Sequence, residues 1–267
     1  MRLSNKIYYE KVFKTEDDFE KISELLYELD FNNFYFLENN EGKFLVLVSD
    51  DSKELENLES RLPFKLEFIE LRTTSSDDWI KNIITKPFEF IDGVYIDPDH
   101  NEIEAEYVIR IIPGLAFGTG LHATTKLAAE FLRKYLKPGM NVLDLGCGSG
   151  ILSILARKLG ASYVLGVDND KIAVEVAKEN IQLNDVDNIE IRESDLLKNV
   201  DGKFDIIVSN IIAEVLIEAL KNIEEFLKKD GVVILSGIIN SKLDLFKNFN
   251  IVDYRRSGEW NSIVIKF

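Results

Sequence analysis

The first part of the chain alternates between apolar and polar residues in four short stretches, the pattern of strands that bury one face. These stretches are residues 7–13, 33–38, 43–49 and 65–71. Apolar residues at helical spacing predict one helix from Phe19 to Leu29 and a second over Leu55 to Leu62, with Ser52 as its N-cap. The order βαββαβ predicts a small ferredoxin-like α+β domain at residues 1–71.

From Thr124 onward the pattern changes to strands that alternate with helices, which predicts a doubly wound α/β sheet covered on both faces. The expected strands are residues 141–145, 163–167, 189–193, 204–209 and 232–236, followed by an antiparallel edge hairpin of 251–256 and 262–267. Helices are expected over 171–184 and 214–227. The pattern therefore predicts a seven-stranded, Rossmann-like domain after the small one.

A Thr/Ser/Asp cluster after Leu71 indicates a linker over residues 72–86 that leads into a short helix. Short strands are expected next, at residues 88–91, 94–96 and 107–112. We therefore assign the larger domain to residues 87–267.

The charge is strongly acidic and uneven along the chain. There are 47 Asp and Glu against 32 Lys and Arg, a net charge of −15. Residues 1–112 carry −13 and residues 113–267 carry −2, which predicts a nearly neutral larger domain behind an acidic front. An acidic surface repels phosphate backbones, so direct nucleic-acid binding is not expected and a basic protein is the better partner. The alternative is that the charge only keeps a small domain soluble.

The rare residues limit the chemistry. Cys147 is the one cysteine, and His100 and His122 are the only histidines, so neither a disulfide nor a metal site is predicted. No apolar run is long enough for a membrane span, and the first residues lack a secretory signal. We expect a cytoplasmic protein with no membrane partner.

A glycine-rich turn, Gly146-Cys147-Gly148-Ser149-Gly150, lies between a predicted buried strand and a helix, as a nucleotide loop requires. A dinucleotide loop has its third glycine one residue later and holds a pyrophosphate, so an NAD-dependent oxidoreductase is disfavoured. Asp144, two residues before the loop, favours a cation, and Asp168 after the next strand suits ribose hydroxyls. S-adenosylmethionine, which carries a sulfonium, an amino group and no phosphate, is the predicted cofactor. A non-catalytic binding module is the alternative outside enzymes.

Several segments together resemble the ribosomal protein L11 methyltransferase family. They are PGLAFGTGLHATT at residues 113–125, LDLGCGSGIL at 143–152, NIIA at 210–213, LSGI at 235–238 and EW at 259–260. The resemblance implies a class I, S-adenosylmethionine-dependent enzyme that trimethylates lysine side chains and the terminal amine of one large-subunit ribosomal protein. It also implies that the cofactor is contacted by Thr125, Gly146, Asp168 and Asn210. We add Gly148, which belongs to the same glycine-rich turn, to these expected contacts.

Two departures from the family pattern bear on substrate contacts. Leu121 and Ala123 stand where the family usually has Thr and Pro, and a second Trp is absent near residues 81–85. The alternative function is therefore a methyltransferase of a small molecule or of another protein's amines, which would need no acidic recognition domain.

Asn210 is the predicted catalytic residue because it follows the fourth strand of the sheet. Enzymes that methylate planar nitrogens place an aromatic residue after two prolines here, whereas this chain has Ile211, Ile212 and Ala213, which indicates an aliphatic amine. We expect Asn210 to accept a hydrogen bond from that amine. His122 is predicted to take or relay the proton, the alternative being that it satisfies local backbone groups.

Two aromatic residues complete the expected site. Phe117 is expected to cover the cofactor or to pack in the core, and Trp260 to wall the amine pocket or to pack at the sheet edge. The basic ribosomal protein is expected to dock on the acidic N-terminal domain, which would steer it to the catalytic domain.

Overall fold

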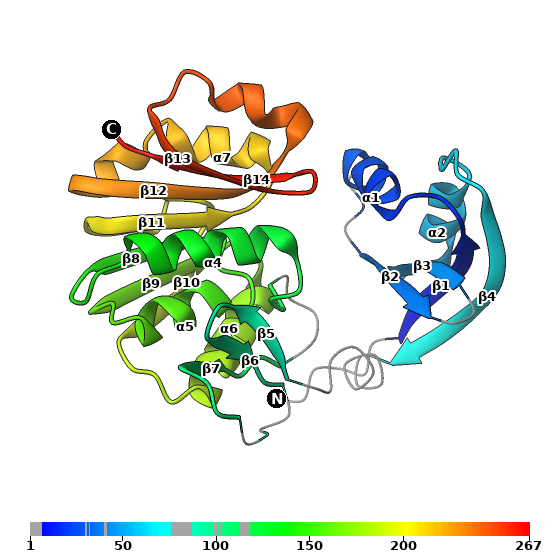
Figure 1. The fold of residues 1–267 in the computed structure, drawn as a ribbon, viewed down its shortest axis with the longest axis horizontal. Coiled ribbons are helices and arrows are strands. Elements are labelled where there is room, and N and C mark those ends of the chain that lie inside the picture. The colour runs from blue at the N-terminus through cyan, green and yellow to red at the C-terminus, as the bar shows by residue number, and fades with distance from the viewer. Residues whose placement is uncertain are drawn as a thin grey trace. The chain divides into compact units, whose positions relative to one another are not determined.

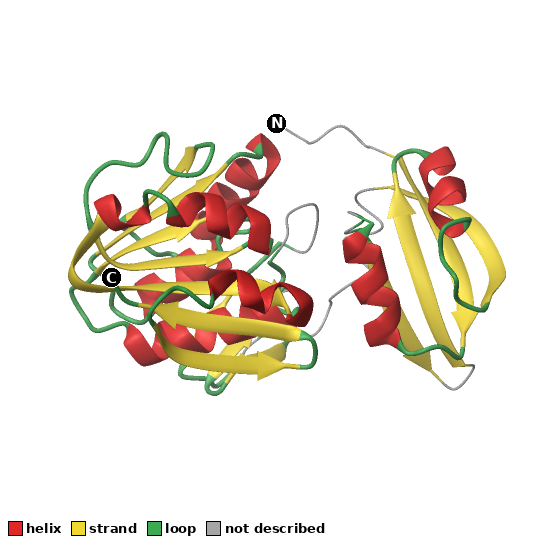
Figure 2. Cartoon of the chain, turned by 90° about the horizontal axis from the view of Figure 1, so that it is seen from above, coloured by secondary structure: helices red, strands yellow, loops and turns green. Residues whose placement is uncertain are grey.

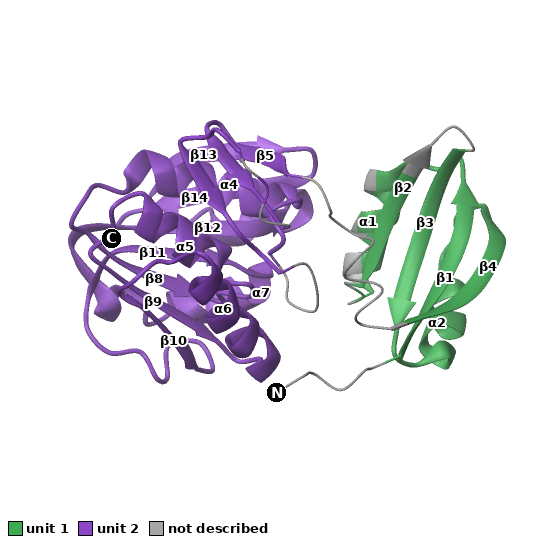
Figure 3. Cartoon of the chain, turned by 90° about the horizontal axis from the view of Figure 1, so that it is seen from below, with its two compact units in different colours: residues 1–83 green, residues 84–267 purple. Residues whose placement is uncertain are grey.

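The computed structural model describes residues 7–29, 31, 33–39, 42–75, 87–98, 101, 103–112 and 118–267. The chain divides into two compact units, unit 1 at Met1–Ile83 and unit 2 at Ile84–Phe267 (Figure 3). The short helix predicted within residues 72–86, and Phe117, lie outside the described residues. Among the helices that are described, none has the length and apolar character needed to span a membrane.

Unit 1 is a four-stranded antiparallel sheet with two helices (Figure 1). Its elements are β1 (Ile7–Thr15), α1 (Phe19–Glu28), β2 (Phe34–Asn39), β3 (Gly42–Ser49), α2 (Ser52–Glu59) and β4 (Leu66–Ser75). The strand order β2-β3-β1-β4 confirms the predicted βαββαβ arrangement. Ile22 and Leu26 of α1 and Leu55 of α2 pack with Phe13 and Leu45 of the sheet, so both helices cover the same face.

Two predicted boundaries in unit 1 are wrong. The predicted linker begins at Arg72, but Arg72 to Ser75 continue β4 and pair with β1, where Arg72 forms an ion pair with the buried Glu10. The polar side chains of these residues resemble a linker in the sequence, but they belong to β4, which is an edge strand of the sheet, where polar side chains are common. Ser52 is the predicted N-cap of α2, but Asp51 caps the helix by accepting a hydrogen bond from the Lys53 amide, and Ser52 is its first residue.

Unit 2 contains a three-stranded sheet of β5 (Phe88–Ile91), β6 (Val94–Ile96) and β7 (Tyr107–Ile109), beside a seven-stranded sheet. The larger sheet and its helices run in chain order as α4 (Ala123–Tyr135), β8 (Asn141–Leu145), α5 (Ile151–Lys158), β9 (Tyr163–Asp168), α6 (Lys171–Leu183), β10 (Ile189–Glu193), β11 (Phe204–Asn210), α7 (Ala213–Leu220), β12 (Leu227–Ile239), β13 (Ile251–Ser257) and β14 (Trp260–Ile265). Short 3-10 helices cover Ile223–Phe226 and Asn240–Phe246.

The seven strands lie in the order β10-β9-β8-β11-β12-β14-β13. The first five are parallel, and β14 is antiparallel to both of its neighbours, β12 and β13. The doubly wound sheet and its closing hairpin are therefore confirmed. The turn from β8 into α5 and the end of β11 lie at the carboxyl edge of the parallel strands, where open α/β sheets bind ligands.

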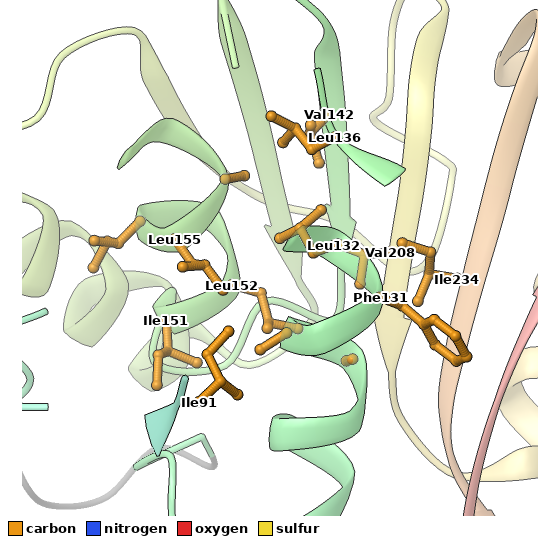
Figure 4. Packing of buried hydrophobic residues seen from close by; sticks show 14 of the residues in the cluster. Ile91, Phe131, Leu132, Leu136, Val142, Ile151, Leu152, Leu155, Val208 and Ile234 are labelled. Carbon is orange, nitrogen blue, oxygen red and sulfur yellow. The ribbon is translucent and has the colours of Figure 1, made fainter. Parts of the chain in front are cut away.

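Alternate residues of the strands face opposite layers of helices. Val142, Val208 and Ile234 pack with Phe131 of α4 and Leu155 of α5 in one core cluster (Figure 4). The intervening strand residues pack with Leu216 and Leu220 of α7 in a second cluster. Burial on both faces explains why these strands consist of nearly continuous Val, Ile and Leu. The red helices on the two sides of the yellow sheet show the layers (Figure 2).

Two predicted elements of unit 2 end earlier than expected. The helix over residues 214–227 ends at Leu220, because Leu227 already pairs with Phe204 at the start of β12. The strand over residues 107–112 ends at Ile109, because the next backbone groups bond to the side chains of Asn180 and Asn184 instead of to another strand.

Candidate functional site

The glycine loop is fastened to the end of the neighbouring strand. The amides of Gly146 and Cys147 both donate to the carbonyl of Val167, at 2.8 and 3.0 Å. Gly146 has φ +77°, and a Cβ on it would lie 2.5 Å from Cγ2 of Ile211. Only glycine fits there, because a side chain would meet Ile211 and the backbone is in the left-handed region.

Asp168 and the glycine loop are in direct contact. Asp168 ends β9, and its Oδ2 accepts from the Gly148 amide at 2.9 Å while Oδ1 accepts from the Asp170 amide at 3.0 Å. These bonds fix the carboxylate at the carboxyl edge of the sheet. Two residues that the sequence assigns to the same ligand, Gly148 and Asp168, are therefore neighbours.

Asp144 is buried in β8, close to the loop. Its Oδ2 accepts from the hydroxyl of Ser153 at 2.7 Å. Burial raises the pKa of this carboxyl to about 7, the nearby charge of Asp168 also acts to raise it, and the bond from Ser153 opposes the rise. Near neutral pH a cation beside the loop would favour the ionised form of Asp144.

Cys147, inside the loop, is buried, and burial raises the pKa of its thiol well above the usual range. The thiol is therefore protonated and inert, so Cys147 is a small buried residue between two glycines and not a nucleophile.

Asn210 and Thr125 meet where β11 ends and α4 begins. The Nδ2 of Asn210 donates to the Thr125 hydroxyl at 3.1 Å, and both side chains are buried. Ser209, the residue before, donates from its hydroxyl to the Leu145 carbonyl at 2.7 Å and holds β11 against β8. Because Nδ2 faces Thr125, Oδ1 is the end of the carboxamide that can accept from an amine.

His122 is the N-cap of α4. Its Nδ1 accepts from the Thr124 amide at 3.3 Å and lies 2.7 Å from the Thr124 hydroxyl. Its ring meets Trp260 edge to face, with centroids 4.9 Å apart. Burial lowers the pKa of the imidazole to about 4, so it is neutral at physiological pH. A base this weak is poorly suited to take a proton from an amine, and the geometry favours the capping role over the predicted proton transfer.

Two further residues, Ser236 and Gly237, lie behind this site, and the sequence pattern predicts no role for either. The Ser236 hydroxyl donates to the Thr124 carbonyl at 2.7 Å. Gly237 has φ +86°, and a Cβ on it would lie 2.3 Å from the carbonyl oxygen of Ile211. The glycine lets β12 approach the backbone that follows Asn210. A glycine directly after a predicted buried strand is the signal in the sequence that could have indicated this approach.

A parallel sheet with one antiparallel strand inserted next to its edge, a G-x-G-x-G turn after the central strand and an acid ending the next strand define a class I methyltransferase. The family profile described as ribosomal protein L11 methyltransferase (PrmA) matches residues 8–267. The chain therefore belongs to the ribosomal protein L11 methyltransferase family.

Relatives and a solved structure agree with this assignment. The ribosomal protein L11 methyltransferase of Thermosipho africanus is 67% identical over 98% of this chain and 99% of its own length. That of Thermotoga maritima is 43% identical over 92% of this chain and 94% of its own length. A crystal structure of the ribosomal protein L11 methylase from Lactobacillus delbrueckii subsp. bulgaricus matches with a TM-score of 0.63 and 36% identity, over 67% of this chain and 97% of that one.

Proposed function

We propose that this protein transfers methyl groups from S-adenosylmethionine to lysine side-chain and N-terminal amines of ribosomal protein L11. The observation that carries the proposal is the Asn210–Thr125 contact, which leaves a buried amide oxygen as the acceptor for an amine in a chain of this family. The predicted cofactor residues Thr125, Gly146, Gly148, Asp168 and Asn210 all belong to this edge of the sheet or to the start of α4.

The residues present fit the chemistry of S-adenosylmethionine. The Asp168 carboxylate can accept from two ribose hydroxyls while its backbone bonds hold it in place. The ionised form of Asp144 complements a cation, and Gly146 and Gly148, both at positive φ, form a tight turn whose backbone carries no side chain at these positions. S-adenosylmethionine supplies an electrophilic methyl group on a sulfonium. The protein has to place the amine in line with that methyl and to exclude water.

The amine must be neutral before it reacts. Deprotonation of a lysine with an ordinary pKa near 10.4 costs about 4 to 5 kcal/mol of free energy at pH 7, whereas deprotonation of a terminal amine costs about 1 kcal/mol. Oδ1 of Asn210 would accept an N–H bond and direct the lone pair to the methyl group. A methylated nitrogen that still carries an extra proton would release it to water, because the Asn210 carboxamide is not a base and the buried His122 is a very weak one.

The substrate is proposed to dock on unit 1 through charge. Unit 1 has 19 acidic and 11 basic residues, a net −8 over 83 residues, and unit 2 has 28 and 21, a net −7 over 184 residues. The prediction of a nearly neutral catalytic domain is therefore wrong, because residues 84–112, with a net −5, belong to unit 2. The acidic charge is still denser in unit 1, which favours it as the docking surface for a basic protein.

The test is to incubate the enzyme with purified ribosomal protein L11 and labelled S-adenosylmethionine, followed by peptide mass spectrometry. We expect labelled methyl groups on lysine and N-terminal amines. No label on ribosomal protein L11, together with label on a small molecule or on another protein when a cell extract is used in its place, would favour the alternative substrate instead.

A further inference from the structure

Ser149, the fourth residue of the glycine loop, forms hydrogen bonds through both its hydroxyl and its carbonyl. The hydroxyl donates to the carbonyl of Gly118 at 2.6 Å. The carbonyl accepts from Nδ2 of Asn180, on α6, at 2.8 Å. Ser149 and Asn180 are both almost completely buried. The loop therefore makes two strong contacts with parts of the chain outside its own strand and helix.

Asn180 carries the second contact further. Its Oδ1 accepts from the Ile112 amide at 2.8 Å, so one carboxamide joins Ile112 to the Ser149 carbonyl. The described residues on either side of 113–117 are thus tied to one residue of the glycine loop. Ile112 is tied through Asn180, and Gly118 is tied directly.

Asn184, the C-cap of α6, lies one turn beyond Asn180 and forms a similar clamp on the backbone of Arg110. Its Oδ1 accepts from the Arg110 amide at 2.8 Å, and its Nδ2 donates to the Arg110 and Asn180 carbonyls at 2.6 and 2.7 Å. Asn180 and Asn184 are thus two buried amides on one helix face that hold the same stretch of backbone. Of the two, Asn180 is the one that also bonds to the glycine loop.

We propose that Asn180 and Ser149 are positioning residues that set the glycine loop for the cofactor and hold it against Ile112 and Gly118. This inference rests on the proposed function, since it assumes that S-adenosylmethionine binds at the loop. Losing the bond from Asn180 frees the Ser149 carbonyl and weakens cofactor binding. Losing the Ser149 hydroxyl releases Gly118 and slows methyl transfer more than it weakens cofactor binding.

Matched substitutions separate this role from ordinary packing. Asn180→Asp keeps an acceptor for Ile112 but removes the donor to Ser149, and Asn184→Asp makes the same chemical change in the neighbouring clamp. Both should lower the melting temperature, Asn184→Asp at least as much as Asn180→Asp, because the side-chain nitrogen of Asn184 donates two of these bonds and that of Asn180 donates one. In calorimetric titrations with S-adenosylmethionine, we expect Asn180→Asp to bind about five- to tenfold more weakly, the value of one lost bond to a buried carbonyl, and Asn184→Asp to bind like the wild type.

Ser149→Ala, a small change that preserves the carbonyl bond to Asn180, provides a second measurement. We expect its kcat for methyl transfer to fall while cofactor affinity stays within about twofold of the wild type. Equal cofactor affinities for the Asn180→Asp and Asn184→Asp enzymes, or a Ser149→Ala enzyme with wild-type kcat, would overturn the inference. A wild-type protein that does not bind S-adenosylmethionine would instead refute the proposed function.

Discussion

The side-chain nitrogen Nδ2 of Asn210 lies 3.1 Å from the hydroxyl of Thr125. This hydrogen bond joins the end of a parallel strand to the first turn of a helix that lies 85 residues earlier in the chain. The contact decides which end of the carboxamide faces an incoming amine. It also makes the orientation of Asn210 depend on a residue that itself is a predicted cofactor contact.

Replacing Asn210 with Ala should lower kcat by about a hundredfold or more, because the amine loses the acceptor that directs its lone pair. Steady-state methylation assays measure this, and equilibrium titration with S-adenosylmethionine serves as the control. Thr125→Val should cause part of the same loss, whereas Thr125→Ser, which keeps the hydroxyl, should not. An Asn210→Ala enzyme with full activity and unchanged cofactor affinity would refute the role of Asn210.

The pH dependence of methylation should come from the substrate amine and not from His122. With a pKa of about 4, His122 stays neutral from pH 6 to 9, so the rate should rise with pH as the amine loses its proton. His122→Asn keeps an acceptor at the N-cap and should change the level of the pH–rate curve without changing its shape. If the methylation rate of the wild type instead showed a titration near pH 6 to 7 that is absent from the His122→Asn enzyme, the result would support proton transfer by His122.

Asp144 should make the folded protein less stable as the pH rises. Its folded pKa of about 7 lies above the unfolded value near 4, so the folded state holds an extra proton between these limits. The contribution is therefore most favourable below about pH 4 and is lost as the pH rises to about 7. Urea unfolding at pH 5 and pH 8 should show Asp144→Asn gaining stability relative to the wild type at the higher pH. Parallel pH dependences would contradict this expectation.

Gly237→Ala should impair catalysis by moving the backbone behind Asn210. The new Cβ would lie 2.3 Å from the Ile211 carbonyl oxygen, so the turn after β11 must shift, and we expect a loss of at least about tenfold in kcat. Gly202→Ala is the matched control, because Gly202 has a similar φ of +88° and a Cβ there would meet no atom of the described residues within 4 Å. Both variants share the backbone strain, so equal effects on kcat would show that the contact with Ile211 is unimportant.

Salt should weaken capture of the protein substrate more than binding of the cofactor. Raising the salt to about 0.5 M screens charges beyond a few ångströms, so KM for ribosomal protein L11 should rise while cofactor affinity changes little. Glu56→Lys, on the exposed face of α2, should raise that KM more than Glu224→Lys, a change at an exposed residue of unit 2. Equal effects of the two charge reversals on KM would indicate that the acidic charge of unit 1 only keeps the protein soluble.

Periodicity predicted the strands and helices well where apolar side chains decide the structure, as in β8 to β12. It failed where polar side chains determine the backbone hydrogen bonds. Arg72 to Ser75 resemble a linker because an edge strand can be polar, and the predicted strand after Ile109 is replaced by bonds to Asn180 and Asn184. Both asparagines are buried, along α6 and at its C-cap, whereas the apolar Ile172 of the same helix is exposed.

The sequence predicts which residues form the candidate site but not how they are arranged in space. The glycine spacing and the acids indicated the cofactor, and the missing aromatic after Asn210 indicated the type of amine. The sequence could not show that His122 is buried against Trp260, since the two lie far apart in the chain and meet only because α4 packs on β12 and β14. The approach of Gly237 to Ile211 differs in this respect, because a glycine directly after a predicted buried strand could have indicated it.

The position of β14 restricts how unit 2 can be divided for experiments. Because β14 lies between β12 and β13, a fragment that stops at Ile239 would leave the apolar residues Val233 to Leu235 on an open sheet edge. Such an edge invites pairing with other chains, so that fragment should aggregate. A soluble catalytic fragment must therefore extend through Ile265.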